Sequence, residues 1–196
     1  TMETIALAFA LTEEAVEDNL YDKISTRYTK ALARSMANTK QVKAANILNR
    51  GFNSSYLGGD AKELLATDHP TLSGDQKNEL STAADLNETS LEQALIDIAD
   101  MKDERGLKIA LRGMKLIIPV NLQFNVERLL KSPGRPATAD NDINAVKSMG
   151  MIPQGYVVNN FLTDTDAWFI KTDAPNGLKH FVRAPIRTAM EGDFDT

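Results

Sequence analysis

One stretch without proline, from Thr12 to Phe52, constrains the fold of this chain more than any other. It opens with carboxylates and continues with cations, an order that complements the helix macrodipole. Thr12 is a suitable N-cap because its hydroxyl can accept a hydrogen bond from a free backbone N–H, and Gly51 offers a left-handed helix end. The sequence therefore predicts one helix of about 39 residues, roughly 58 Å long at 1.5 Å per residue.

This predicted helix is longer than the globule that could surround it. A compact chain of 196 residues has a radius of gyration of about 16 Å, which corresponds to a diameter of roughly 42 Å. We therefore expect an elongated molecule whose helix needs partners outside its own domain.

Two lines of side chains follow the predicted helix. Apolar residues recur at every fourth position, so each step drifts by about 40° and the apolar stripe winds around the helix. Its members are Val16, Leu20, Ile24, Tyr28, Leu32 and Met36. A line of cations, which begins at Lys23, lies on another face, and acidic residues crowd the first turns. These charges form either a solvated face or a contact with a neighbouring subunit or nucleic acid, and the acidic turns of the next copy would be a natural partner. The candidate interface residues are Glu13, Glu14, Glu17, Arg27, Lys30 and Arg34.

The rest of the chain mixes strand and helix signals. Ile5–Leu11 alternates large apolar residues with alanine, which favours a strand, although alanine and leucine would also suit an early helix turn. Residues 53–86 are rich in Gly, Ser, Thr and Asp and predict a long loop. A capping-box pattern begins at Thr89. Apolar spacing predicts helices at 91–103, 121–131 and 142–149, and strands at 107–111, 115–118, 156–158, 167–170 and 179–183. The predicted class is α+β.

Composition excludes several classes of protein. The chain is 42% apolar and 25% charged, as is ordinary for a folded domain, and its net charge of −5 argues against a general nucleic-acid binder. It has no cysteine, so no disulfide, thiolate metal site or cysteine nucleophile is expected. No signal peptide and no apolar run near 18 residues is present, which predicts neither secretion nor a membrane span. Because the chain begins at Thr1 rather than Met, we expect a part of a longer polypeptide.

Signals for catalysis are weak, and we predict no enzyme, no cofactor and no metal site. The two histidines, His69 and His180, fit turn, interface or strand positions better than a catalytic pair. The carboxylate pairs Asp140/Asp142 and Asp164/Asp166 lack the glycine and bidentate glutamate of a calcium loop, so turn and cap roles are favoured. Lys131 and Arg135 are weak candidates for a phosphate contact. Trp168 fits core packing better than a base-stacking platform.

Six segments, in order along nearly the whole chain, carry a resemblance to a known family. The segments resemble those of tailed-bacteriophage major capsid proteins, whose capsid fold is named after phage Hong Kong 97. They are ALARSMANTKQVKAANILNRGF, GGDAKELLATDHP, AADLNETSLEQALIDI, LIIPVNLQFNVERLLKS, GRPATADNDINAV and NNFLTDTDAWFIKT.

The resemblance implies a division of the chain that is incomplete at both ends. Residues 1–11 would be the returning strand of an extended loop, and residues 12–52 the spine helix of a peripheral domain. Residues 53–173 would form the axial domain, and residues 174–196 a strand of the peripheral sheet. The implied function is a head subunit that self-assembles as pentamers and hexamers into an icosahedral shell around double-stranded DNA. The implied location is the virion, after assembly in the host cytoplasm with scaffolding, portal or decoration proteins and no membrane.

Three other functions stay open on the sequence alone. A non-viral encapsulating shell protein of the same fold would enclose protein cargo. A carboxylate- or metal-dependent hydrolase would lose activity on Asp164→Ala or Asp166→Ala. A DNA-binding module would show an affinity that falls steeply with salt.

Overall fold

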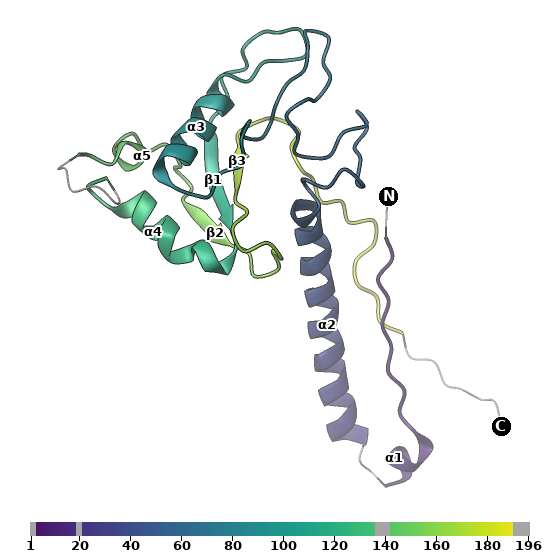
Figure 1. Ribbon diagram of the computed structural model, residues 1–196. Coiled ribbons are helices and arrows are strands. Elements are labelled where there is room, and N and C mark those ends of the chain that lie inside the picture. Colours follow the sequence, from purple (N-terminus) through teal and green to yellow (C-terminus); the bar gives the residue numbers. More distant parts are fainter. Residues whose placement is uncertain (1–2, 19–20, 136–141, 190–196) are drawn as a thin grey trace.

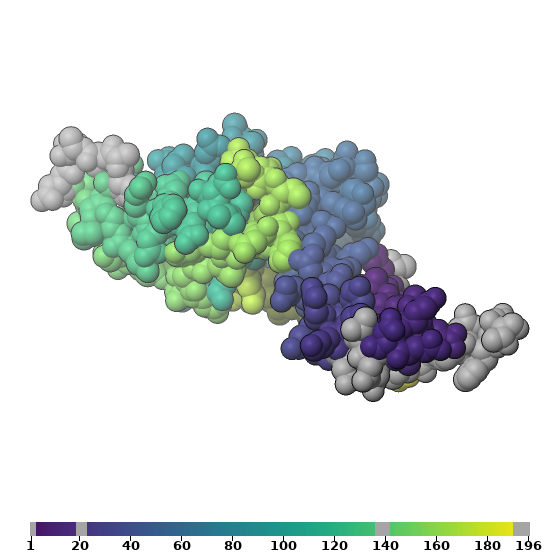
Figure 2. All heavy atoms as spheres, turned by 90° about the horizontal axis from the view of Figure 1, so that it is seen from below, coloured from purple at the N-terminus to yellow at the C-terminus, as the bar shows by residue number. Residues whose placement is uncertain are grey.

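The computed structural model describes residues 3–18, 21–135 and 142–189. The molecule is elongated, with a mixed helix-and-sheet body at one end and a long helix that projects from it (Figure 1). A perpendicular view shows the residues that precede this helix lying beside it, away from the body (Figure 2). The predicted α+β class is therefore confirmed. The elements in chain order are α1 (Glu13–Glu17), α2 (Tyr21–Asn49), α3 (Glu88–Ala99), β1 (Gly113–Ile118), the 3-10 helix η1 (Val120–Leu122), α4 (Gln123–Lys131), α5 (Ala145–Ser148), β2 (Tyr156–Val158) and β3 (Phe169–Thr172).

A three-stranded sheet in the order β2–β1–β3 forms the centre of the body. β1 pairs in parallel with β2, which places Leu116 opposite Tyr156, and antiparallel with β3, which places Leu116 opposite Ile170. A parallel pair cannot be joined by a tight turn, and here the connection from β1 to β2 carries η1, α4 and α5. The strands predicted at 115–118, 156–158 and 167–170 are confirmed, with small shifts at their ends.

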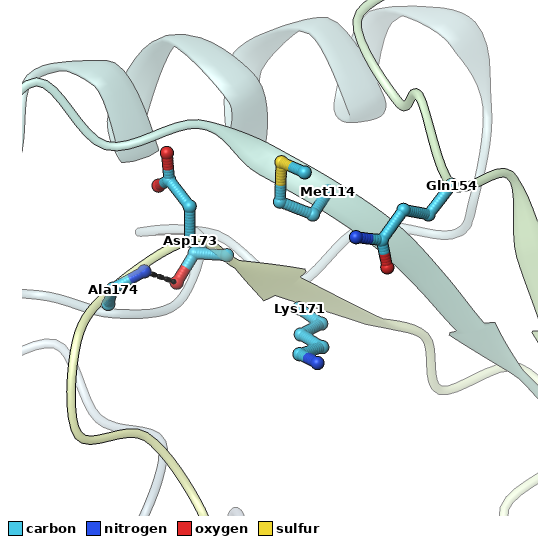
Figure 3. Close-up of a pocket in the computed structure, with 6 residues that line it drawn as sticks. Met114, Gln154, Lys171, Asp173 and Ala174 are labelled. Carbon is cyan, nitrogen blue, oxygen red and sulfur yellow. Dashed lines mark hydrogen bonds between the residues drawn. The ribbon is translucent and has the colours of Figure 1, made fainter.

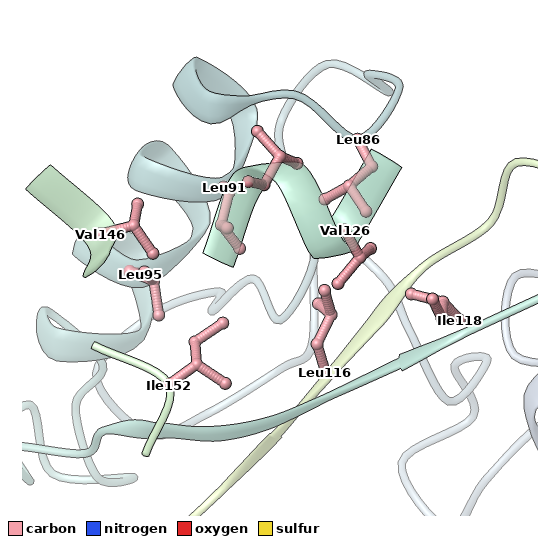
Figure 4. Packing of buried hydrophobic residues seen from close by; sticks show 9 residues of the cluster. Leu86, Leu91, Leu95, Leu116, Ile118, Val126, Val146 and Ile152 are labelled. Atoms are coloured by element: carbon pink, nitrogen blue, oxygen red, sulfur yellow. The ribbon is translucent and has the colours of Figure 1, made fainter. Parts of the chain in front are cut away.

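The hydrophobic core lies between this sheet and helices α3 and α4 (Figure 4). Leu116 and Ile118 of β1 are fully buried because alternate side chains of a strand point to the same face. They meet Leu91 of α3 and Val126 of α4. Each such buried side chain contributes roughly 1.5–3 kcal/mol relative to its exposed state. Gly113 suits this packing, since a Cβ there would lie 2.6 Å from a methyl carbon of Leu95, which would have to shift.

Helix α3 begins earlier than the sequence pattern indicated. The N-cap is Asn87, whose side-chain oxygen accepts a hydrogen bond from the Ser90 backbone N–H at 2.9 Å. The Ser90 hydroxyl in turn accepts one from the Asn87 N–H at 3.0 Å, which completes a capping box. Asn is a stronger N-cap than Thr, and this explains why the box forms at Asn87 rather than at Thr89.

The single helix predicted for Thr12–Phe52 is wrong. α1 ends at Glu17, Asp18 is its C-cap, and α2 runs from Tyr21 to Asn49. Asp and Asn are poor helix formers, and the carboxylates crowded into the first turns repel one another, so the acidic stretch does not continue as one helix with the basic stretch. With 29 residues, α2 is roughly 44 Å long, still a length comparable to that of a compact globule of this chain.

Three predicted strands are not formed within the described chain. Residues 5–11 are extended but pair with no other strand among the described residues, and the same holds for residues 179–183. Residues 107–111 form one isolated bridge between Lys102 and Lys108, and Ala110 has a positive φ of 56°, which interrupts a strand. The helices predicted at 121–131 and 142–149 are found as α4 and the short α5. An alternating sequence pattern does not show whether a neighbouring strand is available, and this explains why the three strands were predicted.

The predicted long loop between α2 and α3 is confirmed, and local polar contacts hold its shape. His69 and Gln76 exchange two backbone hydrogen bonds of 2.8 Å. The Asn78 side chain accepts from the Ala66 N–H at 2.9 Å and donates to the Leu64 carbonyl at 2.8 Å. The Asn78 side chain thus makes two hydrogen bonds across the loop that resemble those between backbone groups of paired strands.

The fold generates a first prediction about Leu116. Leu116→Ala leaves a cavity between β1, α3 and α4, and we expect it to lower the free energy of unfolding by about 2–5 kcal/mol. Leu72→Ala is the matched control, because Leu72 is 84% exposed and the same change there should cost less than about 0.5 kcal/mol. Urea denaturation of both variants measures the difference, and equal midpoints would contradict the described core.

Candidate interaction surface

Helix α2 stands outside the core and is attached to the body at its C-terminal end. Among its described side chains, Ala45 is the one that is fully buried. Asn49 donates its amide to the Phe161 carbonyl at 3.1 Å and accepts the Thr163 N–H at 3.1 Å. Just beyond the helix, Phe52 stacks on Phe169 with ring centroids 5.8 Å apart. These contacts set the direction in which the helix leaves the body.

One face of α2 is covered by the extended residues 3–12. Figure 1 shows this segment running beside the helix down to α1. Phe9 packs on Tyr28 with ring centroids 5.6 Å apart, and Glu3 forms an ion pair of 2.7 Å with Lys43. The hydrogen bond from Lys43 holds the pKa of Glu3 below its usual value, so this exposed contact weakens as the pH falls through that lowered pKa. Ile24, Leu32 and Met36 are half-buried on the covered side of the helix.

The predicted cations lie on the opposite side of α2. At 3.6 residues per turn, they are displaced by roughly 150° from the stripe that contains Tyr28 and Leu32. All are exposed, and no ion pair to them occurs among the described parts of the chain. They form a line roughly 16 Å long, which we call the cationic face. Its residues are Lys23, Arg27, Lys30 and Arg34.

The predicted acidic residues lie on α1, beside the free end of α2 (Figure 1). Glu13, Glu14 and Glu17 are all exposed. We call them the acidic tip. The structure does not bring the acidic tip and the cationic face together as ion pairs within the described chain. α1 lies on the side of α2 along which residues 3–12 run, and the cationic face points away from that side (Figure 1).

Sequence reasoning missed the residues that orient this rod. Asn49 contacts residues 112 and 114 positions away, and such distant partners leave no local pattern. The pairing of Phe9 with Tyr28 depends on the chain reversing direction before α2. The one usable signal was the apolar stripe itself, which required some covering segment.

The structure gives the contacts of the residues considered for chemistry. The Nδ1–H of His69 donates to the Asp60 carboxylate at 2.6 Å, and this hydrogen bond lowers the pKa of the Asp60 carboxyl. Asp164 and Asp166 share a hydrogen bond, which lowers the pKa of Asp164 and raises that of Asp166. His180 is exposed in the extended segment 174–189.

The remaining candidates are also engaged. Lys131 pairs with Glu127 at 2.6 Å, and Arg135 pairs with Glu88 at 2.9 Å, so both weak phosphate candidates already have carboxylate partners. Trp168 packs against the core and donates its indole N–H to the Ala84 carbonyl at 3.0 Å. Asp140 of the other carboxylate pair lies outside the described residues.

A shallow hollow lies at the end of β3 (Figure 3). Its volume is about 280 Å³, and Met114, Gln154 and Lys171 line it with residues 172–174. The Asp173 carboxylate accepts the Arg112 N–H at 2.8 Å, so it holds the chain rather than facing a ligand. Within the described ranges, no three His, Asp or Glu side chains are grouped as a metal site requires. None of the described helices is both long and apolar enough to cross a membrane.

A second prediction concerns the backbone of residues 4–11. Their amides donate no hydrogen bond to another described residue, whereas those of α2 lie in a continuous helix. In the isolated chain we expect residues 5–11 to exchange hydrogen for deuterium at rates close to those of an unfolded peptide, and the second half of α2 to exchange more slowly. Hydrogen-exchange mass spectrometry measures both in one sample. Equal protection of the two segments would show that residues 4–11 are paired in solution.

Comparison with known protein families gives a match over the whole chain. A family model described as phage capsid protein matches residues 1–196, which is the entire chain. No curated protein and no solved structure matches it. The family is one of structural proteins, and its members are located in the capsid of the virion together with other copies. A rod with exposed, complementary charges fits such an assembly. The match over its full length shows that this chain belongs to the phage capsid protein family.

Proposed function

We propose that the chain is the major capsid subunit of a tailed phage, with the Hong Kong 97 phage-like fold, and that copies of it close into an icosahedral shell. The observation that carries this proposal is α2, a helix of 29 residues that stands outside the core with one described side chain fully buried. Such a helix gains little from its own domain and needs packing from elsewhere. In the proposed shell, neighbouring copies supply that packing.

The proposed domains follow the two parts of the molecule. α2 is the spine helix of the peripheral domain, and residues 1–11 are the returning strand of the extended loop. Residues 53–173 are the axial domain, supported by the separate core that α3, α4 and the sheet build within that range. Residues 174–196 return to the peripheral domain. In the shell, axial domains surround the centres of pentamers and hexamers.

The proposed contact between copies joins the acidic tip to the cationic face. Because the two surfaces differ and lie on different sides of the rod, the contact is heterologous, and repeated heterologous contacts close into rings when the rotation allows. Pairs between exposed charges are individually weak, about 0.2–1 kcal/mol each. A shell repeats the contact many times. Weak ion pairs are therefore enough to select the partner and the register in which two copies meet.

The proposed contents of the shell are double-stranded DNA, held without sequence specificity. The net charge of the chain, −5, supports an inner shell surface that binds the DNA weakly. Scaffolding, portal or decoration proteins are the proposed further partners, and the host cytoplasm is the proposed place of assembly. No catalytic step is assigned to the subunit.

Imaging of assembled particles tests the shell directly. The chain is expressed with any flanking segments of its natural polypeptide, and negative-stain electron microscopy is used to look for closed shells or ring-shaped capsomers. Nuclease-protected DNA in shells recovered from infected cells supports the viral function. Shells that hold protein and no DNA would indicate an encapsulating compartment instead, and a protein that stays monomeric at high concentration would contradict both.

A third prediction tests the cationic face. Reversal of two cations, Arg27→Glu with Arg34→Glu, should abolish or strongly reduce particle formation while the far-ultraviolet circular dichroism stays unchanged. The matched control reverses two exposed cations elsewhere, Lys40→Glu with Arg128→Glu, and should assemble normally. If the first pair builds normal particles, the cationic face is not an interface.

A fourth prediction separates direct pairing from a general charge effect. Adding Glu13→Arg and Glu17→Arg to the Arg27→Glu, Arg34→Glu protein restores complementary charges with the signs exchanged, and particles should reappear. Assembly of the native protein should weaken with salt, because the Debye length falls from about 10 Å at 0.1 M to about 3 Å at 1 M. Failure of the exchanged protein to assemble, with the four-fold variant still folded, would contradict the proposed partner.

A further inference from the structure

Residues 174–189 contain a dipeptide whose two residues can react with each other, Asn176 followed by Gly177. It is the single Asn-Gly pair in the sequence. Both residues are exposed and lie in no helix or strand. Asn176 has a φ of 62°, in the left-handed region that residues with a side chain seldom adopt. The pair therefore sits in a strained, accessible turn.

The surroundings of Gly177 leave its backbone nitrogen open. Its N–H donates no hydrogen bond to another described residue. A Cβ built at Gly177 would meet one atom, the Ala174 carbonyl oxygen, at 4.0 Å. The nitrogen is thus neither shielded by packing nor held in a hydrogen bond, and the missing side chain removes the usual obstacle to its approach to a neighbouring group.

A cation contacts the side chain of Asn176. The Lys179 ammonium donates a hydrogen bond of 2.7 Å to Oδ1 of Asn176. A charge-assisted donor on a carbonyl oxygen withdraws electrons from Cγ and stabilises the negative charge that develops on Oδ1 when a nucleophile adds. Lys179 is itself exposed, so the effect is screened and modest.

We propose that Asn176 is a site of spontaneous deamidation, promoted by Gly177 and Lys179. The Gly177 nitrogen loses its proton to solvent and attacks Cγ of Asn176, forming a new C–N bond and a five-membered succinimide. The bond from Cγ to Nδ2 breaks, and the nitrogen takes up a proton and leaves as ammonia. Water then opens the ring without any oxidation or reduction. Attack at Cγ yields aspartate, and attack at the backbone carbonyl carbon yields isoaspartate.

The reaction changes the charge and the path of this segment. Residues 174–189 carry three cations, Lys179, Arg183 and Arg187, and no carboxylate. Deamidation places a carboxylate beside Lys179, and isoaspartate also inserts a methylene group into the main chain. If the proposed function holds, a shell outside its host cannot replace its subunits, so the change accumulates with age. This consequence rests on the proposed function, whereas the reaction itself does not.

The test follows the peptide that contains Asn176 during incubation of the full chain in mildly alkaline buffer. We expect the mass increase that accompanies exchange of an amide for a carboxyl, with isoaspartate identified by enzymatic methyl transfer. Asn53, which is also exposed but whose Oδ1 accepts the Ser55 N–H at 2.9 Å, is the internal comparison and should change more slowly. If the Asn176 peptide changes no faster than the Asn53 peptide, the proposal is wrong.

Two variants test the mechanism. Gly177→Ala has room for its methyl group, so the protein should fold normally and lose the mass change over the same interval. Lys179→Gln should slow the reaction by about two- to fivefold, as expected for removal of one exposed charge. An unchanged rate in Gly177→Ala would exclude the succinimide route, and an unchanged rate in Lys179→Gln would exclude a part for the ammonium. These readouts use the isolated chain, so they are independent of whether shells form.

Discussion

The architecture depends on the junction where the last turn of α2 meets the body. Asn49 uses both ends of its amide to hold the loop that follows β2, and Phe52 stacks on Phe169 of β3. A helix that is attached at one end transmits the geometry of that end along its full length. A small rotation at the junction would move the free end of a rod of roughly 44 Å by many ångströms. The polar and aromatic contacts at Asn49 and Phe52 therefore determine where the charges of α1 and α2 are presented.

Away from this junction, the surface carries exposed apolar side chains that association with another copy would bury. Large apolar side chains remain exposed on the extended segments, with Phe181 at 69% and Leu7 at 51%. Burial of each would contribute roughly 1.5–3 kcal/mol, which is more than an exposed ion pair provides. In the proposed shell, apolar burial supplies most of the energy of a contact between copies, and the proposed role of the cationic face and the acidic tip is to select its register.

Failures of the sequence-based prediction have a common cause. Residues 5–11 and 179–183 have strand-like alternation, yet a strand is defined by the partner beside it, and the described chain offers them none. The break before Tyr21 depended on a balance between local repulsion and the packing available to residues 3–12 once the chain had turned back along α2. That packing is not a property of the segment alone.

By itself, the sequence determined the features that arise from local physics. Apolar periodicity specified β1, β2, β3, α3 and α4, and the cluster of Ser, Gly and Asp after α2 specified the long loop. It also determined that the cations from Lys23 to Arg34 share one face, because the helix repeat alone places them there. Only the tertiary structure decided that α1 folds back beside α2, that Asn49 holds the helix to a loop 112 residues away, and that acidic and basic surfaces lie on different sides of one rod. Those outcomes depend on contacts between distant residues, whose free energy no single segment contains.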